Sequence, residues 1–369
     1  MNEKRVSKFE LLRIIAMYLI VLHHSIVHGV LNVEINSELK YPSATILATI
    51  LGTGGKIGVF VFVLITGYFM INSKISLGKV IKLWLPIFFW SIILFGTLNL
   101  FYLHSFSVNN LIKSIFPILF NQYWFMTVYF FMYCMVPLLN IVVNSLDNLK
   151  KILYFTVLGI LIVISQFAFF YGGNHGFVGS YLLAFCFVYC IGALIHKNNI
   201  LKNRSVMKDS NIVLLVLAVV DILVISIFIV LSTKLHIAKL LIWAQAISFD
   251  SSTLMPILLS IGIFNLIGSM NIEYHSSWNK VATVMFGIYL ISDNNYSRNF
   301  IWNGIFSMNH MIDKNPLWIL IYTIIVSAIV FIVCGCLEYL RKLVFGRLEN
   351  KICKYVNDQF LRVILKLKW

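Results

Sequence analysis

The sequence predicts an all-α, polytopic membrane protein with about ten transmembrane helices and both termini in the cytoplasm. Of its 369 residues, 60% are hydrophobic and only 12% are charged, and the mean hydropathy is +0.89. A soluble domain carries about 25% charged residues, so this composition is typical of a chain embedded in a bilayer. About 20 apolar residues cross a bilayer. Ten such runs occur, at roughly 9–31, 44–71, 83–104, 123–145, 152–171, 177–196, 211–232, 251–270, 281–301 and 317–340.

The net charge of +15 is explained by the distribution of Lys and Arg in a membrane protein, and it does not indicate a nucleic-acid site. If ten helices span and both termini are cytoplasmic, the cytoplasmic segments hold more than three times as many Lys and Arg residues as the outer ones. This is the bias that orients membrane proteins. We therefore expect the lipid bilayer as a partner, and no nucleic acid. Residues 1–340 are expected to form the transmembrane domain, and 341–369 a basic amphipathic tail on the cytoplasmic surface.

The first apolar run carries ionisable side chains on one face. Arg13 and His24 are eleven residues apart, which in a helix places both on one face, about 16 Å apart along the axis. Glu10 and His28 extend this face by one turn at each end, whereas His23 points about 100° away and is expected to pack. An ionisable side chain at membrane depth costs about 2.5–3.5 kcal/mol on insertion scales, so such residues often mark a working site. The sequence thus predicts a functional site along this face.

Three motifs follow one another along the chain. The first is an Arg, ten residues and a His (Arg13 and His24), preceded by an acidic residue, Glu10; the second is the glycine segment GGKIGVF; the third is FGIYL, which begins at Phe286. In this order they resemble the membrane-bound acyltransferase 3 family over about residues 9–340. The chain resembles stand-alone members, which have no appended esterase-like domain.

The resemblance implies transfer of an acyl group, usually acetyl, from cytoplasmic acetyl-CoA to a hydroxyl. We expect an O-acetyltransferase of the plasma membrane that modifies a cell-surface polysaccharide or its lipid-linked precursor. His24 suits the role of general base because imidazole titrates near neutral pH. Arg13 stays protonated, so it would hold a phosphate or carbonyl oxygen, or stabilise Glu10.

Two further groups of residues are candidates for binding. Cytoplasmic lysines would meet the phosphates of CoA, although solvated lysines of the positive-inside pattern are the alternative; they are Lys74, Lys79 and Lys82. Residues near the outer ends of their runs are candidates for binding the acceptor: Lys56, His28, Trp124 and Asp293.

Two positions depart from the family pattern. Phe60 stands where the family usually has an Asp, and Asp293 follows the FGIYL motif where a His is common. The loss of the Asp keeps open an inactive or receptor-like relative. A transporter or flippase for a lipid-linked sugar, with Arg13 and His24 as a proton-coupled site, is the other alternative. Transporters more often contain internal repeats, and none is evident here.

No metal is expected. His24 and His28 have the i,i+4 spacing of two ligands, but no third-ligand pattern accompanies them. Five of the six cysteines lie in apolar runs and none forms a paired CxxC set, so they are expected to be small buried residues.

Overall fold

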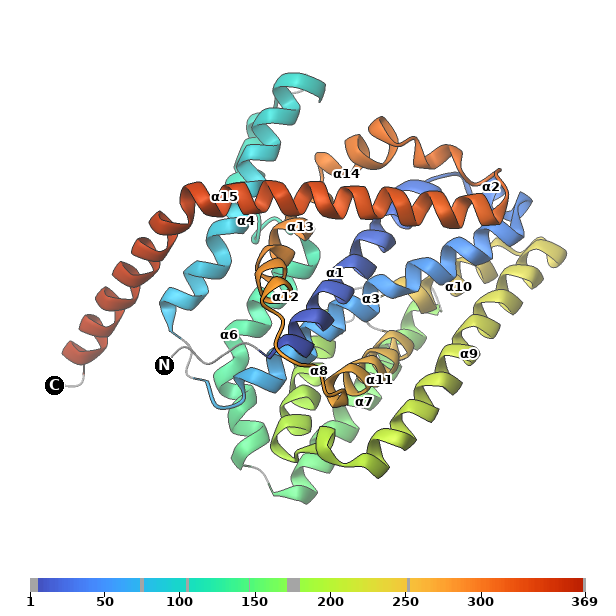
Figure 1. The fold of residues 1–369 in the computed structure, drawn as a ribbon. Helices are drawn as coiled ribbons and strands as arrows, with labels where there is room; N and C mark the ends of the chain where they lie inside the picture. Colours follow the sequence, from blue (N-terminus) through green and yellow to red (C-terminus); the bar gives the residue numbers. More distant parts are fainter. Residues whose placement is uncertain are drawn as a thin grey trace.

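The computed structural model describes residues 6–73, 76–103, 106–145, 147–170, 180–250 and 253–367, and over these ranges the chain is helical with no strands (Figure 1). The predicted all-α class is therefore confirmed for the described residues. The N-terminal half contains α1 (Ser7–Ser25), the π-helical turn η1 (Ile26–Val30), α2 (Ile35–Lys40), α3 (Pro42–Met70), α4 (Leu77–Leu98), η2 (Asn99–Leu103), α5 (Val108–Ile115), α6 (Trp124–Ser145) and α7 (Asn148–Phe170).

The C-terminal half contains longer outer helices and a broken inner segment. Its elements are α8 (Ser180–Lys197), η3 (Ile200–Lys202), α9 (Arg204–Leu235), α10 (Ala238–Phe249), α11 (Leu254–Ser269), α12 (Ser276–Val281), η4 (Ala282–Val284), α13 (Met285–Ser292), α14 (Ser297–Asn299), η5 (Phe300–Ile305), η6 (Met308–His310) and α15 (Pro316–Leu367). The apolar run 281–301 is thus divided among short elements, and the break after Ser292 lies within it.

Helix length and composition support a multi-pass membrane protein. Within the described ranges, seven helical segments are long and apolar enough to cross a membrane: Ser7–Val30, Pro42–Met70, Leu77–Tyr102, Trp124–Ser145, Arg204–Leu235, Ala238–Ser269 and Pro316–Phe360. A shorter apolar helix covers Tyr181–Lys197. The count of about ten spans and the cytoplasmic location of both termini stay predictions.

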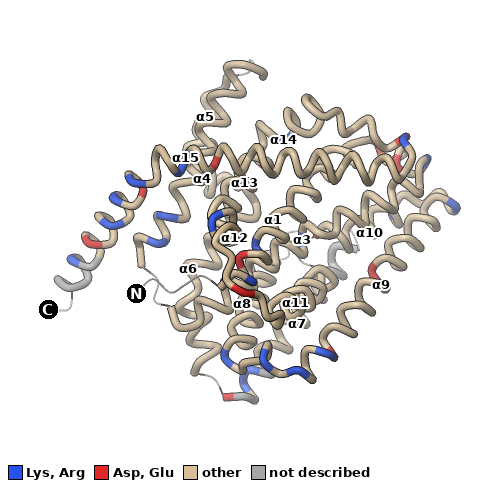
Figure 2. The backbone as a smooth tube through the Cα atoms, in the orientation of Figure 1, with Lys and Arg blue, Asp and Glu red and all other residues tan. Residues whose placement is uncertain are grey.

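The charged residues lie mainly at the ends of helices. Figure 2 shows Lys and Arg on the C-terminal part of α15, at the start of α4 and around the turn between α8 and α9, while long stretches of helix carry no charge. This distribution agrees with helices that keep their charges at membrane surfaces.

Helix α15 contains both the last apolar run and the basic tail. It is a single helix of 52 residues, and Figure 1 shows it crossing one side of the molecule and then bending beside α4. The predicted boundary at residue 340 is therefore not marked by a break in the helix. Residues 341–367 continue the same helix.

Helices α1 and α3 pack against each other at the centre of the fold, and the glycine segment is the reason they can. A Cβ at Gly55 would overlap the side chain of His23, and one at Gly58 would overlap the backbone carbonyl oxygen of Ala16. Glycine lets the two backbones approach to this distance, as small residues do at membrane helix contacts. Phe60, on the same helix, is fully buried and packs edge-on to Phe185, with 5.8 Å between ring centroids.

We predict that Gly58→Ala destabilises the fold, because the added methyl group has to displace the α1 backbone. Overpacking of this kind costs about 1–3 kcal/mol. The matched control is Gly159→Ala on α7, where a Cβ would meet no described atom within 4 Å. Ala is the better helix former, so this control should be neutral or stabilising. Thermal unfolding in detergent measures both variants, and an unchanged midpoint for Gly58→Ala would contradict the close approach.

Glu38 on α2 is buried and accepts a hydrogen bond from the side-chain amide of Gln245 on α10. Burial raises the pKa of Glu38 from 4.5 to about 7, and the hydrogen bond from Gln245 opposes this change. The neutral carboxyl is therefore favoured in the folded protein.

The raised pKa predicts that stability falls as the pH rises from about 4.5 to 7. In this window the folded protein keeps the proton of Glu38 while the unfolded chain has lost it, so raising the pH favours unfolding. Glu38→Gln stays neutral and retains an acceptor for Gln245, so it should remove this part of the pH dependence. The measurement is the unfolding midpoint of both proteins at pH 5 and pH 8. An equal change of the unfolding midpoint between pH 5 and pH 8 in the two proteins would show that Glu38 does not contribute to the pH dependence of stability.

Candidate active site

A cluster of three ionisable side chains lies at the C-terminal end of α1. His24 is in the last turn of α1, His28 follows in η1, and Asp293 immediately follows α13. One oxygen of Asp293, Oδ1, is 3.2 Å from Nε2 of His28 and 3.7 Å from Nε2 of His24. The side chains of His24 and Asp293 are each only 5% exposed. The chain thus places one carboxylate between two imidazole rings inside the fold.

The second ring nitrogen of His24 is available for chemistry. Among the described residues, Nδ1 of His24 has no hydrogen-bond partner, although it is buried. Because Nε2 faces the Asp293 carboxylate, the tautomer protonated on Nε2 leaves a lone pair on Nδ1. A neutral imidazole oriented in this way can accept a proton from a hydroxyl.

The residues predicted to bind the acceptor surround His24. They line a cavity of about 160 Å³ together with His24 itself, and are Lys56, His28, Trp124 and Asp293. The ammonium group of Lys56 lies 3.8 Å from the centroid of the Trp124 ring, a cation–π distance. The structure brings these four together, and their binding role stays a prediction.

Sequence reasoning missed other residues of this cavity. Arg298 from α14 and Tyr289 from α13 also line it, and Tyr289 lies within the FGIYL motif. The loop after Asp293 is held by Asn294, whose amide donates to the hydroxyl of Tyr123 over 2.6 Å. Only the break after Ser292 brings Arg298 back to the cavity, and the hydropathy of the run does not reveal that break.

His23 has a structural role. Its Nδ1 lies 2.6 Å from the carbonyl oxygen of Gly52 on α3, and its side chain fills the space opposite Gly55. This contact fixes the rotation of α1 and therefore the direction in which His24 points.

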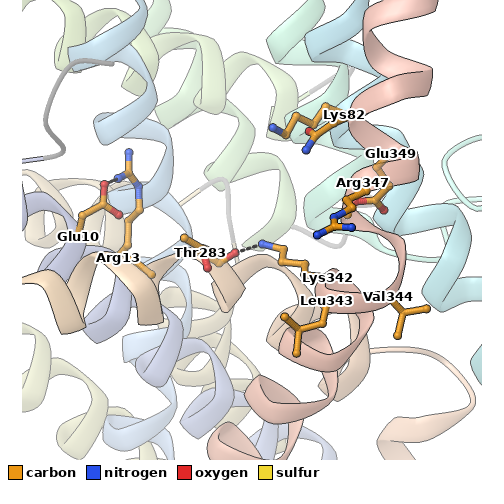
Figure 3. A pocket seen from close by; sticks show the side chains of 12 residues that line it. Glu10, Arg13, Lys82, Thr283, Lys342, Leu343, Val344, Arg347 and Glu349 are labelled. Carbon is orange, nitrogen blue, oxygen red and sulfur yellow. Dashed lines mark hydrogen bonds and ion pairs between the residues drawn. The ribbon is translucent and has the colours of Figure 1, made fainter. Parts of the chain in front are cut away.

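A second and larger cavity lies at the N-terminal end of α1. It has a volume of about 1070 Å³ and is lined by Glu10, Arg13 and Lys82, together with residues of α15. Arg13 and Glu10 form an ion pair at 2.5 Å, and Figure 3 shows the pair on the side of the cavity opposite Lys82. Lys79 is exposed and does not line the cavity, and Lys74 lies outside the described residues.

The predicted Arg–His pair therefore serves two different cavities. Arg13 lines the larger one and His24 the smaller, as expected for residues about 16 Å apart along one helix. One helix face thus carries residues of a wide cavity with several cations at one end and of a small cavity with a buried imidazole at the other.

The chain was compared with protein-family models, curated proteins and solved structures. A family model described as an acyltransferase domain, of the acyltransferase 3 family, matches residues 6–338. The chain belongs to the acyltransferase 3 family. No curated protein and no solved structure matches it in these comparisons. With its apolar helices, it is a membrane acyltransferase.

In this acyltransferase, a buried ion-pair network holds α15 beside the larger cavity. The guanidinium of Arg341 donates to both carboxylate oxygens of Glu338, over 2.8 and 2.9 Å, and also to Glu349. Glu338 accepts a further hydrogen bond of 2.7 Å from the indole of Trp90 on α4. Gly287 on α13 leaves the space that Glu338 occupies. The network therefore joins α15 to α4 and α13.

We predict that Arg341→Met strongly destabilises this acyltransferase, because the buried Glu338 would lose both hydrogen bonds from the guanidinium and keep only Lys342, at 3.8 Å, as a nearby cation. Breaking a buried pair from one side costs about 3–5 kcal/mol. The control is Asp147→Asn, which removes an ion pair with Lys150 whose side chains are 57% and 67% exposed. Exposed pairs contribute little, so the control should melt near the wild-type temperature. Equal melting of wild type and Arg341→Met would show that the network is not needed for stability.

Proposed function

We propose that this membrane acyltransferase is an O-acetyltransferase of the plasma membrane, with both termini in the cytoplasm. It takes acetyl from acetyl-CoA and transfers it to a hydroxyl of a cell-surface polysaccharide or its lipid-linked precursor. The observation that carries the proposal is the buried His24, with one ring nitrogen facing Asp293 and the other free of partners among the described residues.

In the proposed reaction, Nδ1 of His24 removes the proton of the acceptor hydroxyl while the hydroxyl oxygen attacks the thioester carbonyl. Asp293 holds the ring in its reactive tautomer and stabilises the imidazolium that forms, as carboxylates do in acyl-transfer sites. The C–S bond then breaks, and the imidazolium returns its proton to the departing CoA thiolate. The products are the O-acetyl ester and free CoA.

Positive charge beside His24 suits the oxyanion of the intermediate. Lys56 and Arg298 line the same cavity, and preorganised cations near a developing negative charge are an effective source of rate enhancement. At about 160 Å³ the cavity is below the range of about 300–1,000 Å³ for ligand pockets. It suits the reacting groups better than a whole donor.

The larger cavity is the proposed entrance for acetyl-CoA. Its volume of about 1070 Å³ is slightly above that range, and Arg13 and Lys82 supply positive charge. The nucleotide part of the donor binds there, and its flexible pantetheine arm follows α1 toward His24.

The test is transfer of radiolabel from acetyl-CoA to an extract of the host's surface glycans, by the purified protein in liposomes. We expect transfer by the wild type and a loss of about 10²–10⁴-fold in His24→Ala, which is the usual contribution of a general base. Asp293→Asn, which keeps the shape but not the charge, should also lose activity because the ring is no longer held in its reactive tautomer.

The matched control is His236→Asn. His236 is exposed and adopts a left-handed conformation (φ 56°) at the end of α9, which Asn tolerates, so transfer should be unchanged. Full activity in His24→Ala would exclude it as the base. A wild type that moves a lipid-linked sugar, but neither transfers nor hydrolyses acetyl-CoA with a competent acceptor present, would replace the proposal with a transporter.

A further inference from the structure

The wall of the larger cavity is provided mainly by α15. More than half of the residues that line it lie between 342 and 350, beyond residue 338, where the match to the family model ends. The basic tail that the sequence suggests as a membrane-surface helix therefore takes part in a cavity.

The cations of this wall face the α1 side of the cavity. Figure 3 shows Lys342 and Arg347 of α15 on the side away from the Glu10–Arg13 pair, with Lys82 of α4 close to them. The ammonium group of Lys342 donates to the carbonyl oxygen of Thr283. It lies 3.8 Å from Glu338, so its position is defined by the fold.

The carboxylates of the cavity do not cancel this charge. Glu10 is paired with Arg13, and Glu349 with the buried Arg341. Among the described residues, neither Lys82 nor Arg347 has a carboxylate oxygen within 4.0 Å. Lys82 and Arg347 therefore keep their charge available for a ligand. Lys342 adds a third cation, because its nearest carboxylate, that of Glu338, is already paired with Arg341.

The location of His24 decides which part of a donor meets this wall. The thioester has to travel along α1 toward His24, so the opposite end of the donor remains on the α15 side. In CoA that end carries the 3′-phosphate, a terminal phosphate monoester. Arg presents a planar fork that suits such a group, and Lys adds a compact charge.

We propose that Lys342 and Arg347 form a phosphate-binding wall that recognises the 3′-phosphate of the CoA donor. The inference rests on the proposed function, because it takes acyl-CoA as the donor. The hydrogen bond from Trp90 of α4 to the buried Glu338 holds this wall in place, which reduces the ordering required on binding. The tail beyond residue 338 is then a specificity element of the donor site.

The test compares the binding of CoA and 3′-dephospho-CoA by calorimetry, with the full chain in phosphatidylcholine nanodiscs. We expect the wild type to bind CoA about tenfold more tightly than 3′-dephospho-CoA, as a charge-assisted phosphate contact provides. Arg347→Gln and Lys342→Gln should weaken CoA binding toward the dephospho value, and leave 3′-dephospho-CoA binding within about twofold. In transfer assays KM for acetyl-CoA should rise while kcat is retained, because the phosphate is remote from the reacting atoms.

The matched control is Lys351→Gln, which removes an exposed cation of α15 that does not line the cavity; it should retain the discrimination. Arg347 is itself exposed, so its replacement should leave the unfolding temperature unchanged. A variant that weakens both ligands equally, or neither, would overturn the proposal, as would a wild type that binds no CoA.

With the same variants, the content of anionic lipid in the nanodiscs is varied, and acetyl transfer is measured in a separate assay. If the wall binds lipid headgroups instead, the variants will change the response to phosphatidylglycerol in the nanodiscs while CoA discrimination is absent, and the proposal fails. If wild type transfers acetyl but Arg347→Gln keeps the discrimination, this inference fails and the proposed function stands. If CoA discrimination depends on Arg347 but no acetyl is transferred, the proposed function fails and the phosphate site stands.

Discussion

The candidate site depends on the close approach of α1 and α3. The glycines of α3 leave room for the α1 backbone at Ala16 and for the ring of His23, and His23 is fixed by the carbonyl oxygen of Gly52. Because His24 is the next residue, this contact sets the direction in which its imidazole points. The glycines of this segment therefore act through helix packing, because they determine the position of the His24 imidazole. Lys56 of the same segment lines the cavity beside it.

The two ends of α1 have different electrostatic characters. At one end His24 and Asp293 are almost completely buried, where a low dielectric strengthens their interaction. At the other end Arg13 is 27% exposed and borders a wide cavity with further cations. Such an arrangement suits a reaction in which a highly charged donor keeps its phosphates near water while its uncharged acyl end enters the bilayer region. In the proposed reaction, this separation also limits the access of water to the thioester.

Helix α15 connects the larger cavity to the rest of the fold. Its buried Glu338 is tied to Trp90 and Arg341, and Arg341 reaches Glu349 two turns further on. A buried carboxylate is costly unless it is paired, so this network favours one position of α15 relative to α4. The same position brings Lys342 and Arg347 to the cavity. Membrane-surface contact by the exposed apolar side chains of this segment, such as Val344 and Leu348, is compatible with this role.

The sequence by itself determined the helical membrane class, the family, and the presence of Glu10, Arg13, His24 and His28 on one helix face, because composition and helical periodicity are local properties of the chain. Only the tertiary structure decided that Arg13 and His24 line separate cavities, because each cavity is formed by other helices that pack around one end of α1. It also placed Asp293 between His24 and His28, through a break that the uniform hydropathy of residues 281–301 conceals. The sequence also did not reveal that Lys342 and Arg347 line the larger cavity. A basic amphipathic helix has the same pattern whether it lies on a membrane or lines a cavity, and here the contacts of the buried Glu338 with Arg341 and Trp90 decide its position.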